Sequence, residues 1–219
     1  MNVFKKFYCR AFQTVFRAAL PLLPYREPEI MHSVNDVASL TDKLGVKTVM
    51  LVTDSGLAGA GITAPLEKLL EEHGVKCVVY DKTRANPTVA NVEEALRLYN
   101  QENCGCLIAF GGGSSMDCAK AIGARVAYPK KPLSKLKGTL KVIRKIPTLV
   151  AIPTTAGTGS EVTLAAVITD SEHNHKYPMN DFSLIPRYAV HDPSVTFTLP
   201  PNLTATTGMD ALTHAVEAY

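Results

Sequence analysis

Short β-branched runs alternate along the chain with stretches in which apolar residues recur at helical spacing. This alternation predicts an α/β fold with a parallel sheet covered by helices, because strands in parallel order need crossover helices between them. The expected strands are residues 47–53, 75–80, 106–110 and 148–152, and the expected helices are residues 65–73, 89–101 and 114–126.

Three groups of small or polar residues directly follow expected strands. Asp54 follows the first strand, the triple glycine at 111–113 follows the third, and Pro153, Thr154 and Thr155 follow the last. Ligands of parallel sheets bind beyond the carboxyl ends of the strands, so we expect these groups to converge on one edge. The basic stretch 128–145 has no regular pattern, and we expect it to be a solvated loop.

Composition narrows the function classes. The 219 residues are 46% hydrophobic and 20% charged, with a formal net charge of +3, which is too even a balance to indicate a nucleic-acid partner. No apolar run reaches the length of a membrane span. Five cysteines without a secretory leader favour reduced thiols in the cytoplasm. We interpret Cys104 and Cys106 as structural residues rather than as a metal-binding pair.

The first 30 residues form a basic extension. Five cationic side chains precede the first acidic residue, Glu27, and apolar side chains recur at roughly helical spacing. A transit peptide or a membrane-surface helix has this character. We favour a leading helix that packs on its own domain or on a partner subunit, and we expect no membrane partner. The apolar positions are Val3, Phe4, Phe7, Phe12, Val15, Phe16 and Leu20.

The glycines at 111–113 are followed by Ser114 and Ser115, between an expected strand and an expected helix. Glycine lets a ligand approach the backbone without a Cβ in the way. The helix start offers free N–H groups and a positive dipole end, which suit a phosphate or pyrophosphate. An ordinary strand–helix turn remains the alternative, since neither the Gly-x-Gly-x-x-Gly fingerprint nor a Walker loop is present.

Two further groups extend the expected crevice. In the stretch 154–161 (TTAGTGSE), hydroxyl groups can donate to phosphate or ribose oxygens, and a capping box at a helix start is the alternative. Asp54 is placed to accept hydrogen bonds from adenosine ribose hydroxyls, and its charge would repel the 2′-phosphate of NADP. The alternative for Asp54 is an ordinary N-cap or turn aspartate.

Asp210 and His214 are the candidate metal ligands. Their i, i+4 spacing places a carboxylate and an imidazole on one face of a helix, about one turn apart. This arrangement suits two ligands of one divalent cation. A local hydrogen bond between the two side chains is the alternative.

Together these segments resemble the iron-containing alcohol dehydrogenase family. The matching segments occur in order: VTD (52–54), NPT (86–88), GGGSSMDCAKAIG (111–123), AIPTTAGTGSEVT (151–163) and GMDALTHAVEAY (208–219). The resemblance covers essentially everything after residue 30. It implies a Rossmann-like dinucleotide-binding domain over residues 31–199, followed by an all-helical metal-binding domain of which residues 200–219 are only the beginning.

The resemblance also implies roles for individual residues. It assigns the ribose contact to Asp54 and the pyrophosphate contact to Gly112, Gly113 and Ser114. It places six more residues around the cofactor: Asn86, Thr154, Thr155, Thr158, Val167 and Lys176. Asp210 and His214 match two of the family's four metal ligands, and the other two are histidines of the helical domain.

This chain departs from the family pattern at its end. It stops at Tyr219, before both later histidines, and we interpret His173, His175 and His191 as structural or solvated. We therefore expect a fragment without a complete active site. The resemblance implies that the full-length form is a homodimer in which iron, or less typically zinc, binds the substrate oxygen. Hydride then passes between a primary alcohol and NAD, with NADP less favoured.

Two other functions remain open from the sequence. One is a zinc-dependent glycerol or polyol dehydrogenase of the wider superfamily, which also contains dehydroquinate synthase. The segments GTGSEVT and GMDALTHAVEAY fit the alcohol dehydrogenase branch better. The other is a non-catalytic nucleotide-binding fragment.

Overall fold

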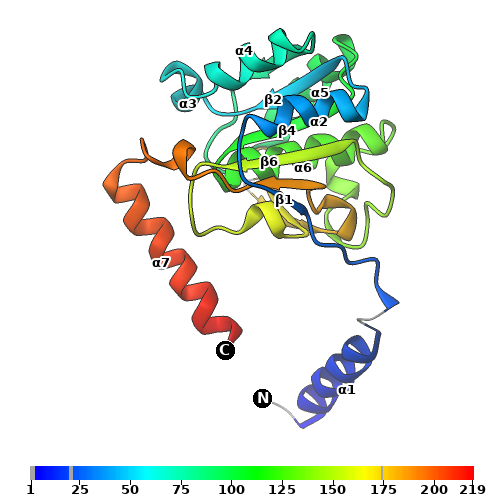
Figure 1. Ribbon diagram of the computed structural model, residues 1–219. Helices are drawn as coiled ribbons and strands as arrows, with labels where there is room; N and C mark the ends of the chain where they lie inside the picture. Colours follow the sequence, from blue (N-terminus) through cyan, green and yellow to red (C-terminus); the bar gives the residue numbers. More distant parts are fainter. Residues whose placement is uncertain (1–2, 20–21, 174) are drawn as a thin grey trace.

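The computed structural model describes residues 3–19, 22–173 and 175–219. Its main body is a parallel six-stranded sheet in the order β1-β9-β6-β4-β2-β3 (Figure 1). The strands are β1 (Glu29–Met31), β2 (Thr48–Val52), β3 (Lys76–Tyr80), β4 (Cys106–Gly111), β6 (Thr148–Pro153) and β9 (Tyr188–Val190). This architecture confirms the predicted α/β fold.

The helices begin and end where local sequence signals place them. Thr88 accepts a hydrogen bond from the backbone N–H of Asn91 and forms a capping box with it. Gly74 takes a left-handed φ of +69° just after α4. The helices are α1 (Val3–Ala19), α2 (Asp36–Leu44), α3 (Ser55–Gly59), α4 (Ala64–Glu72), α5 (Val89–Gln101), α6 (Gly113–Ala127) and α7 (Pro201–Ala218).

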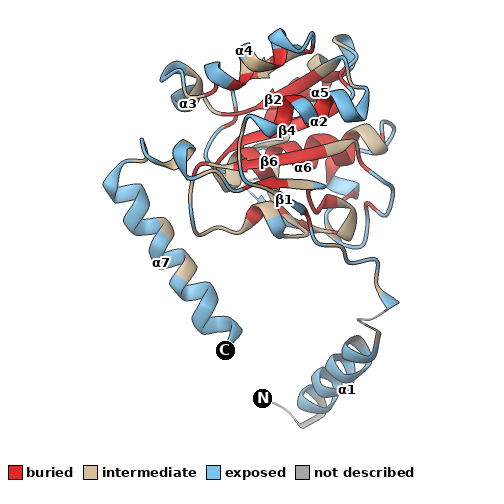
Figure 2. Ribbon diagram, in the orientation of Figure 1, coloured by how far each residue is buried: buried red, intermediate tan, exposed pale blue. Residues whose placement is uncertain are grey.

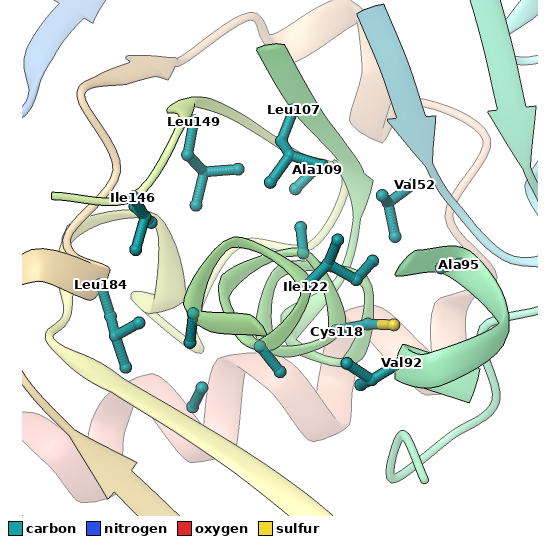
Figure 3. Close-up of a cluster of buried hydrophobic side chains, with 14 of the residues drawn as sticks. Val52, Val92, Ala95, Leu107, Ala109, Cys118, Ile122, Ile146, Leu149 and Leu184 are labelled. Atoms are coloured by element: carbon teal, nitrogen blue, oxygen red, sulfur yellow. The ribbon is translucent and has the colours of Figure 1, made fainter. Parts of the chain in front are cut away.

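The sheet is buried on both faces, as a parallel sheet requires. In β2, Val49 and Leu51 belong to the hydrophobic cluster that includes residues of α2 and α4. Met50 and Val52 belong to the opposite cluster, formed with α5 and α6. Figure 3 shows Val52 of this cluster near Val92 of α5 and Ile122 of α6. All four side chains are fully buried. Apolar residues at successive positions of a strand therefore supply two cores, one on each face.

A second, three-stranded sheet was not predicted. It has the order β5-β8-β7 and contains β5 (Gly138–Thr139), β7 (Ala165–Asp170) and β8 (His175–Asn180). In its centre Pro178 of β8 pairs with Val167 of β7. Proline is expected only at sheet edges and bulges because it lacks an N–H, so the sequence of β8 does not read as a central strand.

The expectation of a solvated loop over residues 128–145 is wrong in part. Its lysines are exposed, but Leu133, Leu136 and Val142 are buried in the core. The segment also contains β5 and a short 3-10 turn, η2 (Leu133–Lys135). The buried carboxylate of Asp181 accepts hydrogen bonds from the backbone N–H groups of Val142 and Ile143, each at 3.0 Å. These apolar residues and this carboxylate fix the loop to the body.

The leading helix α1 lies apart from the main body (Figure 1). The side chains of Phe7 and Val15 are 75% and 69% exposed. The interpretation that this helix packs on its own domain is therefore wrong, and packing on a partner subunit stays a prediction. Leu20 lies outside the described residues, as do the side chains of Val3, Phe4 and Phe16.

The last helix, α7, also extends from the body and contains no buried residue (Figure 2). Its apolar side chains Met209, Leu212 and Val216 are all more than half exposed. Over the described part of the chain, no helix is both long enough and apolar enough to cross a membrane.

Candidate functional site

The strand order reverses between β2 and β4, and a pocket opens there. The chain runs from β2 to β3 on one side, then crosses to β4 on the other side of β2. In open α/β sheets this switch point is where ligands bind. A pocket of about 830 Å³ lies beyond these strand ends, and we call it the crevice. Seven predicted residues line it: Asp54, Gly112, Gly113, Ser114, Thr154, Thr155 and Thr158.

The three glycines of the motif serve different purposes. Gly111 has a φ of +151°, and a Cβ there would lie 2.5 Å from Ser115 Oγ, so only glycine fits. Gly112 has ordinary extended dihedrals, and a Cβ would meet Thr155 at a comfortable 3.5 Å. A Cβ on Gly113 would lie 3.6 Å from Thr158. Backbone geometry therefore does not require the last two glycines, and their effect is to leave space in the crevice.

Polar groups that lack partners among the described residues lie beside this space. No side chain caps the start of α6, so the first N–H groups of the helix are available to a ligand. The hydroxyl of Thr155 is buried and has no hydrogen-bond partner among the described residues. Buried hydroxyls normally find a partner. The free N–H groups of the helix start, the hydroxyl of Thr155 and the open space beside Gly112 and Gly113 together fit a ligand with anionic oxygens.

Asp54 is an N-cap and also lines the crevice. Its Oδ1 accepts hydrogen bonds from the backbone N–H groups of Gly56 at 2.9 Å and Leu57 at 3.1 Å. The N-cap alternative is thus correct as far as Oδ1 is concerned. Within the described residues Oδ2 makes no hydrogen bond or ion pair, so one carboxylate oxygen remains available to a ligand.

Asn86 and Lys176 do not line the crevice, but contacts connect them to it. The backbone N–H of Asn86 donates to Ser114 Oγ at 3.4 Å. Lys176 Nζ donates to Asn86 Oδ1 at 2.6 Å. Asn86 holds a left-handed backbone with φ of +59°. Contacts thus run from the start of α6 through Asn86 to β8.

The remaining predicted cofactor residue, Val167, is bound to a residue that the sequence analysis missed. Its backbone N–H donates to Asp117 Oδ2 at 3.0 Å, and Ser160 Oγ donates to Asp117 Oδ1 at 3.1 Å. Burial raises the pKa of Asp117, against the opposing effect of the nearby ammonium of Lys120. The signal available in the sequence was an acidic residue in the first turns of an otherwise apolar and small-residue helix.

Lys120 is the second residue that the sequence analysis missed. It is fully buried in the middle of α6, where its ammonium contacts oxygens of Ser160, Thr163 and Ala165. Burial lowers the pKa of Lys120 to about 8, although the carboxylates of Asp117 and Glu161 act in the opposite direction. A lysine on a helix face that is otherwise buried is rare unless it is paired.

The stretch 154–161 does not cap an α-helix. It leads through Gly159, at φ of +61°, into the short 3-10 turn η3 (Ser160–Val162), which has no side-chain cap. The capping-box alternative is therefore wrong. Gly157 lies so close to α7 that an added Cβ would be 2.0 Å from the carbonyl oxygen of Thr207. This close approach brings Leu203 and Thr207 of α7 to the crevice wall.

Asp210 and His214 lie on one face of α7, as predicted. His214 Nε2 is 3.7 Å from Asp210 Oδ2, and the two side chains are 60% and 48% exposed. This distance is too long for a hydrogen bond, so the local hydrogen-bond alternative does not hold. Neither residue lines the crevice. Between them they offer one carboxylate and one imidazole to a cation.

The other histidines lie elsewhere. His173 Nδ1 is 2.8 Å from Asp170 Oδ2 in an exposed turn, and His191 Nε2 is 3.7 Å from Glu161 Oε1. Over the described residues, the one three-residue cluster with metal-ligand spacing is Asp170, Glu172 and His173. It does not contain His214, so Asp210 and His214 have no third protein ligand within the part of the chain that the structure describes.

Cys104 and Cys106 are buried free thiols. Burial raises the pKa of Cys104 to about 11 and that of Cys106 to about 12. The thiolate is the form that binds metal, and it is disfavoured at both positions. The Cys106 thiol also donates to the carbonyl oxygen of Thr148 at 3.3 Å. The geometry therefore agrees with the structural interpretation of this pair.

Curated proteins similar to the chain are alcohol-oxidising enzymes by name. The chain is 43% identical over 192 residues to a choline dehydrogenase of Bacillus subtilis, a match that covers 87% of this chain and 47% of the relative. It is 43% identical over 175 residues to alcohol dehydrogenase 4 of Schizosaccharomyces pombe, covering 80% of this chain and 41% of the relative. The chain thus spans about half the length of the curated relatives it matches.

Solved structures share the fold over most of the chain. A 1,3-propanediol oxidoreductase superposes with a TM-score of 0.83 at 34% identity, covering 89% of this chain and 52% of that one. A sulfoacetaldehyde reductase of Bifidobacterium kashiwanohense, solved in complex with NAD⁺, superposes with a TM-score of 0.80 at 28% identity, covering 90% and 53%. The family model of iron-containing alcohol dehydrogenases matches residues 30–193, and the chain belongs to that family.

Proposed function

We propose that the crevice binds NAD(H), and that the chain is the nucleotide-binding part of an iron-dependent alcohol dehydrogenase acting on a primary alcohol or aldehyde. One observation carries the proposal. The Gly112–Gly113 space lies at the uncapped start of α6, at the switch point of the sheet, beside the unpaired hydroxyl of Thr155. Such a site fits a pyrophosphate, which is the part common to dinucleotide cofactors.

The remaining cofactor roles follow from position in the crevice. We assign the adenosine ribose to Asp54, whose Oδ2 is available while Oδ1 caps α3. Thr154, Thr155 and Thr158 form the facing wall. We assign a role in binding or ordering the cofactor beyond that wall to Asn86, Lys176 and Val167. Asn86 contacts Ser114 at the start of α6, and Lys176 donates a hydrogen bond to Asn86. The NAD⁺ complex of the similar sulfoacetaldehyde reductase supports NAD as the ligand class.

We assign the metal to Asp210 and His214, with Fe²⁺ first and Zn²⁺ second. A carboxylate and an imidazole suit either ion, so the donor chemistry fits, although two ligands leave the coordination sphere incomplete. When bound, the ion supplies a Lewis acid that polarises the substrate oxygen. Leu203 and Thr207 of the same helix line the crevice, so α7 connects the two sites.

We also propose domain boundaries, an oligomeric state and a cellular compartment. We assign residues 31–199 to the dinucleotide-binding domain, residues 1–30 to a leading extension, and residues 200–219 to the start of a helical domain. The complete lack of buried residues in α7 supports a boundary just before it. We further propose a homodimeric full-length form in the cytoplasm, for which the free cysteines and the exposed apolar face of α1 are the support.

A nucleotide-binding fragment without catalysis is the second candidate for the chain by itself. The exposed pair Asp210–His214, with no third ligand among the described residues, favours it. The zinc-dependent polyol dehydrogenase alternative has less support, because the matched family and the similar proteins are alcohol dehydrogenases by description.

Two measurements test the proposal. Calorimetric titration of the chain with NAD⁺ and NADP⁺ should show saturable binding, tighter for NAD⁺. Oxidation of a primary alcohol with NAD⁺ and Fe²⁺ should require a version of the chain extended through a helical domain, and His214→Ala should abolish it. Turnover by the 219 residues alone would place the metal site elsewhere, and absence of any dinucleotide binding would refute the crevice assignment.

A further inference from the structure

The ammonium of Lys120 lies in a cage of five oxygens inside the protein. Nζ donates to the carbonyl oxygens of Ser160 at 2.7 Å, Thr163 at 2.9 Å and Ala165 at 2.7 Å. It also contacts the hydroxyls of Ser160 and Thr163, each at 3.2 Å. The side chain is 0% exposed. Among residues 3–19, 22–173 and 175–219, no carboxylate contacts Nζ directly, and its hydrogen-bond partners are backbone and hydroxyl oxygens.

The cage belongs to the segment that carries one wall of the crevice. Thr155 and Thr158 line the crevice just before Ser160, and β7 begins just after Thr163. This stretch has almost no regular structure of its own, only the short turn η3. Residues in such a stretch have few backbone hydrogen bonds to hold them, so external contacts must fix their position.

Helix α6, which contacts this segment through Lys120, also supplies the opposite wall of the crevice at its first residues. Gly113 and Ser114 start α6, and Lys120 lies about two turns further along it. Asp117, between them, accepts hydrogen bonds from Ser160 Oγ and Val167 N. Two charged side chains of α6 thus fix both ends of the stretch 160–167. The distance between the two walls of the crevice therefore depends on contacts of α6.

We propose that Lys120 is a positioning residue for the cofactor: it holds the segment 154–165 against α6 so that the hydroxyls of Thr155 and Thr158 face the space beside Gly112 and Gly113. The proposal rests on the proposed function, because it takes the crevice to be the NAD(H) site. Lys120 itself touches no ligand, since it does not line the crevice.

Removing the ammonium has a defined chemical consequence. Three carbonyl oxygens and two hydroxyls would remain in a buried space without their cation. Buried acceptors without donors are unfavourable, so the segment should move to reach water. Oxygen cages of this kind suit a small monovalent cation, so ammonium or methylammonium from solution should substitute for the side chain in a truncated variant.

The experiment compares Lys120→Ala and Lys120→Met with the parent chain and with Arg125→Met. Arg125 is a matched control, because it is a buried cation on the same helix that contacts Glu93 and the carbonyl oxygen of Tyr128, away from the crevice. NADH affinity and deuterium exchange of residues 154–167 are measured for each. Lys120→Ala is measured again with added ammonium or methylammonium chloride, against matched sodium chloride.

We expect both Lys120 variants to exchange faster over residues 154–167 and to bind NADH about tenfold more weakly, a typical size for coupling between sites. Ammonium or methylammonium should restore much of both losses in Lys120→Ala, whereas sodium should not. Arg125→Met should lower stability without changing NADH affinity. If the Lys120 variants do not fold, Ser160→Ala provides the second test, since it removes one contact to Lys120 and one to Asp117, and it should give a smaller loss of the same kind.

Other results would overturn the proposal in distinct ways. A parent chain that binds NADH, with Lys120 variants that fold and bind equally well, would show that Lys120 has only a structural role. Equal losses in Lys120→Met and Arg125→Met would show that any destabilisation of α6 has this effect. A parent chain that binds no dinucleotide would refute the proposed function first, and the positioning role with it.

Discussion

At the scale of single residues, Asp54 both caps α3 and places a negative charge at the crevice, and one substitution can separate these two effects. Oδ1 caps α3 through Gly56 and Leu57, and the charge of the carboxylate faces the crevice. Asparagine caps helices about as well as aspartate. Asp54→Asn should therefore leave the melting temperature nearly unchanged while it narrows the preference for NAD⁺ over NADP⁺, because repulsion of the 2′-phosphate disappears.

Parallel titrations of NAD⁺ and NADP⁺ check this prediction. Asp36→Asn is the control, since it removes the same charge from the first turn of α2, outside the crevice. The ratio of the two dissociation constants should change only in Asp54→Asn. Tighter binding of NADP⁺ than NAD⁺ by the parent chain would contradict the role given to Asp54.

The buried ammonium of Lys120 predicts a specific pH dependence of stability. Burial lowers its pKa to about 8 in the folded chain, below its ordinary value of 10.5. Between these pH values the unfolded chain binds more protons at this group than the folded chain does. The contribution of Lys120 to the free energy of unfolding should therefore rise as pH increases from about 8 to 10.5.

Urea unfolding of the parent and of Lys120→Met at pH 7.5, 9 and 10 isolates this contribution, since other titrating groups are common to both. The stability difference should shift in favour of the parent as pH rises. A shift in the opposite direction would mean that the five oxygens raise the pKa of Lys120 above its ordinary value.

Sequence reasoning identified the residues that lie next to strand ends and failed for those whose role depends on long-range contacts. Asp54, Gly112 and Thr155 could be placed in one crevice because topology alone brings the carboxyl ends of parallel strands together. Lys120 and Asp117 were missed because their partners at 160–167 lie 40 or more positions further along the chain. Spacing along one helix carries no information about those partners.

At the scale of elements, the basic segment 128–145 depends on one buried carboxylate. Asp181 is 2% exposed and accepts hydrogen bonds from the backbone N–H groups of Val142, Ile143 and Ser183. Asp181→Ala leaves all three donors without that partner, so it should lower the free energy of unfolding by about 3 kcal/mol. Urea denaturation of parent and variant measures this difference.

Asp192→Ala is the comparison for this prediction. Asp192 also accepts from backbone N–H groups, those of Val34 and Ser194, but it lies near the surface, where water can replace it. Its removal should cost about 1 kcal/mol, typical of a cap. Equal losses in the two variants would mean that the hydrogen bonds from Val142 and Ile143 to Asp181 do not fix the basic segment.

Strands and helices with long apolar runs or clear periodicity were predictable from the sequence. Very short strands and a strand interrupted by proline were not. Strands β2, β3, β4 and β6 and helices α4, α5 and α6 carry long apolar runs or clear periodicity, and the structure confirms them within two residues at each end. β1 and β9 have three residues each, too few to show a period. β8 contains Pro178 in a position where a central strand normally donates a hydrogen bond.

At the scale of the whole molecule, α7 presents an apolar face to solvent. Met209, Leu212 and Val216 recur at helical spacing, and each is more than half exposed. Contiguous apolar surface of this kind promotes association. The chain should therefore self-associate with rising concentration in sedimentation velocity, and Leu212→Lys combined with Val216→Lys should shift it toward the monomer.

Thr204→Lys combined with Ala218→Lys is the matched control, since it adds the same two positive charges at exposed positions on the opposite side of the same helix. That pair should change association less than the substitutions on the apolar face. If both pairs act equally, added positive charge rather than loss of apolar surface explains the effect.

The proposed function requires that the space beside Gly112 holds a dinucleotide pyrophosphate. Gly112 has dihedrals that any residue adopts, and a Cβ there meets only Thr155 at 3.5 Å, so Gly112→Val should fold normally while its side chain fills that space. The most direct measurement is NADH fluorescence titration of the parent, Gly112→Val and Gly208→Val, the last adding the same group on α7, where nothing lies within 4 Å. We expect saturable binding by the parent and by Gly208→Val, and none by a folded Gly112→Val. Normal NADH binding by Gly112→Val would refute the assignment of this space to the pyrophosphate.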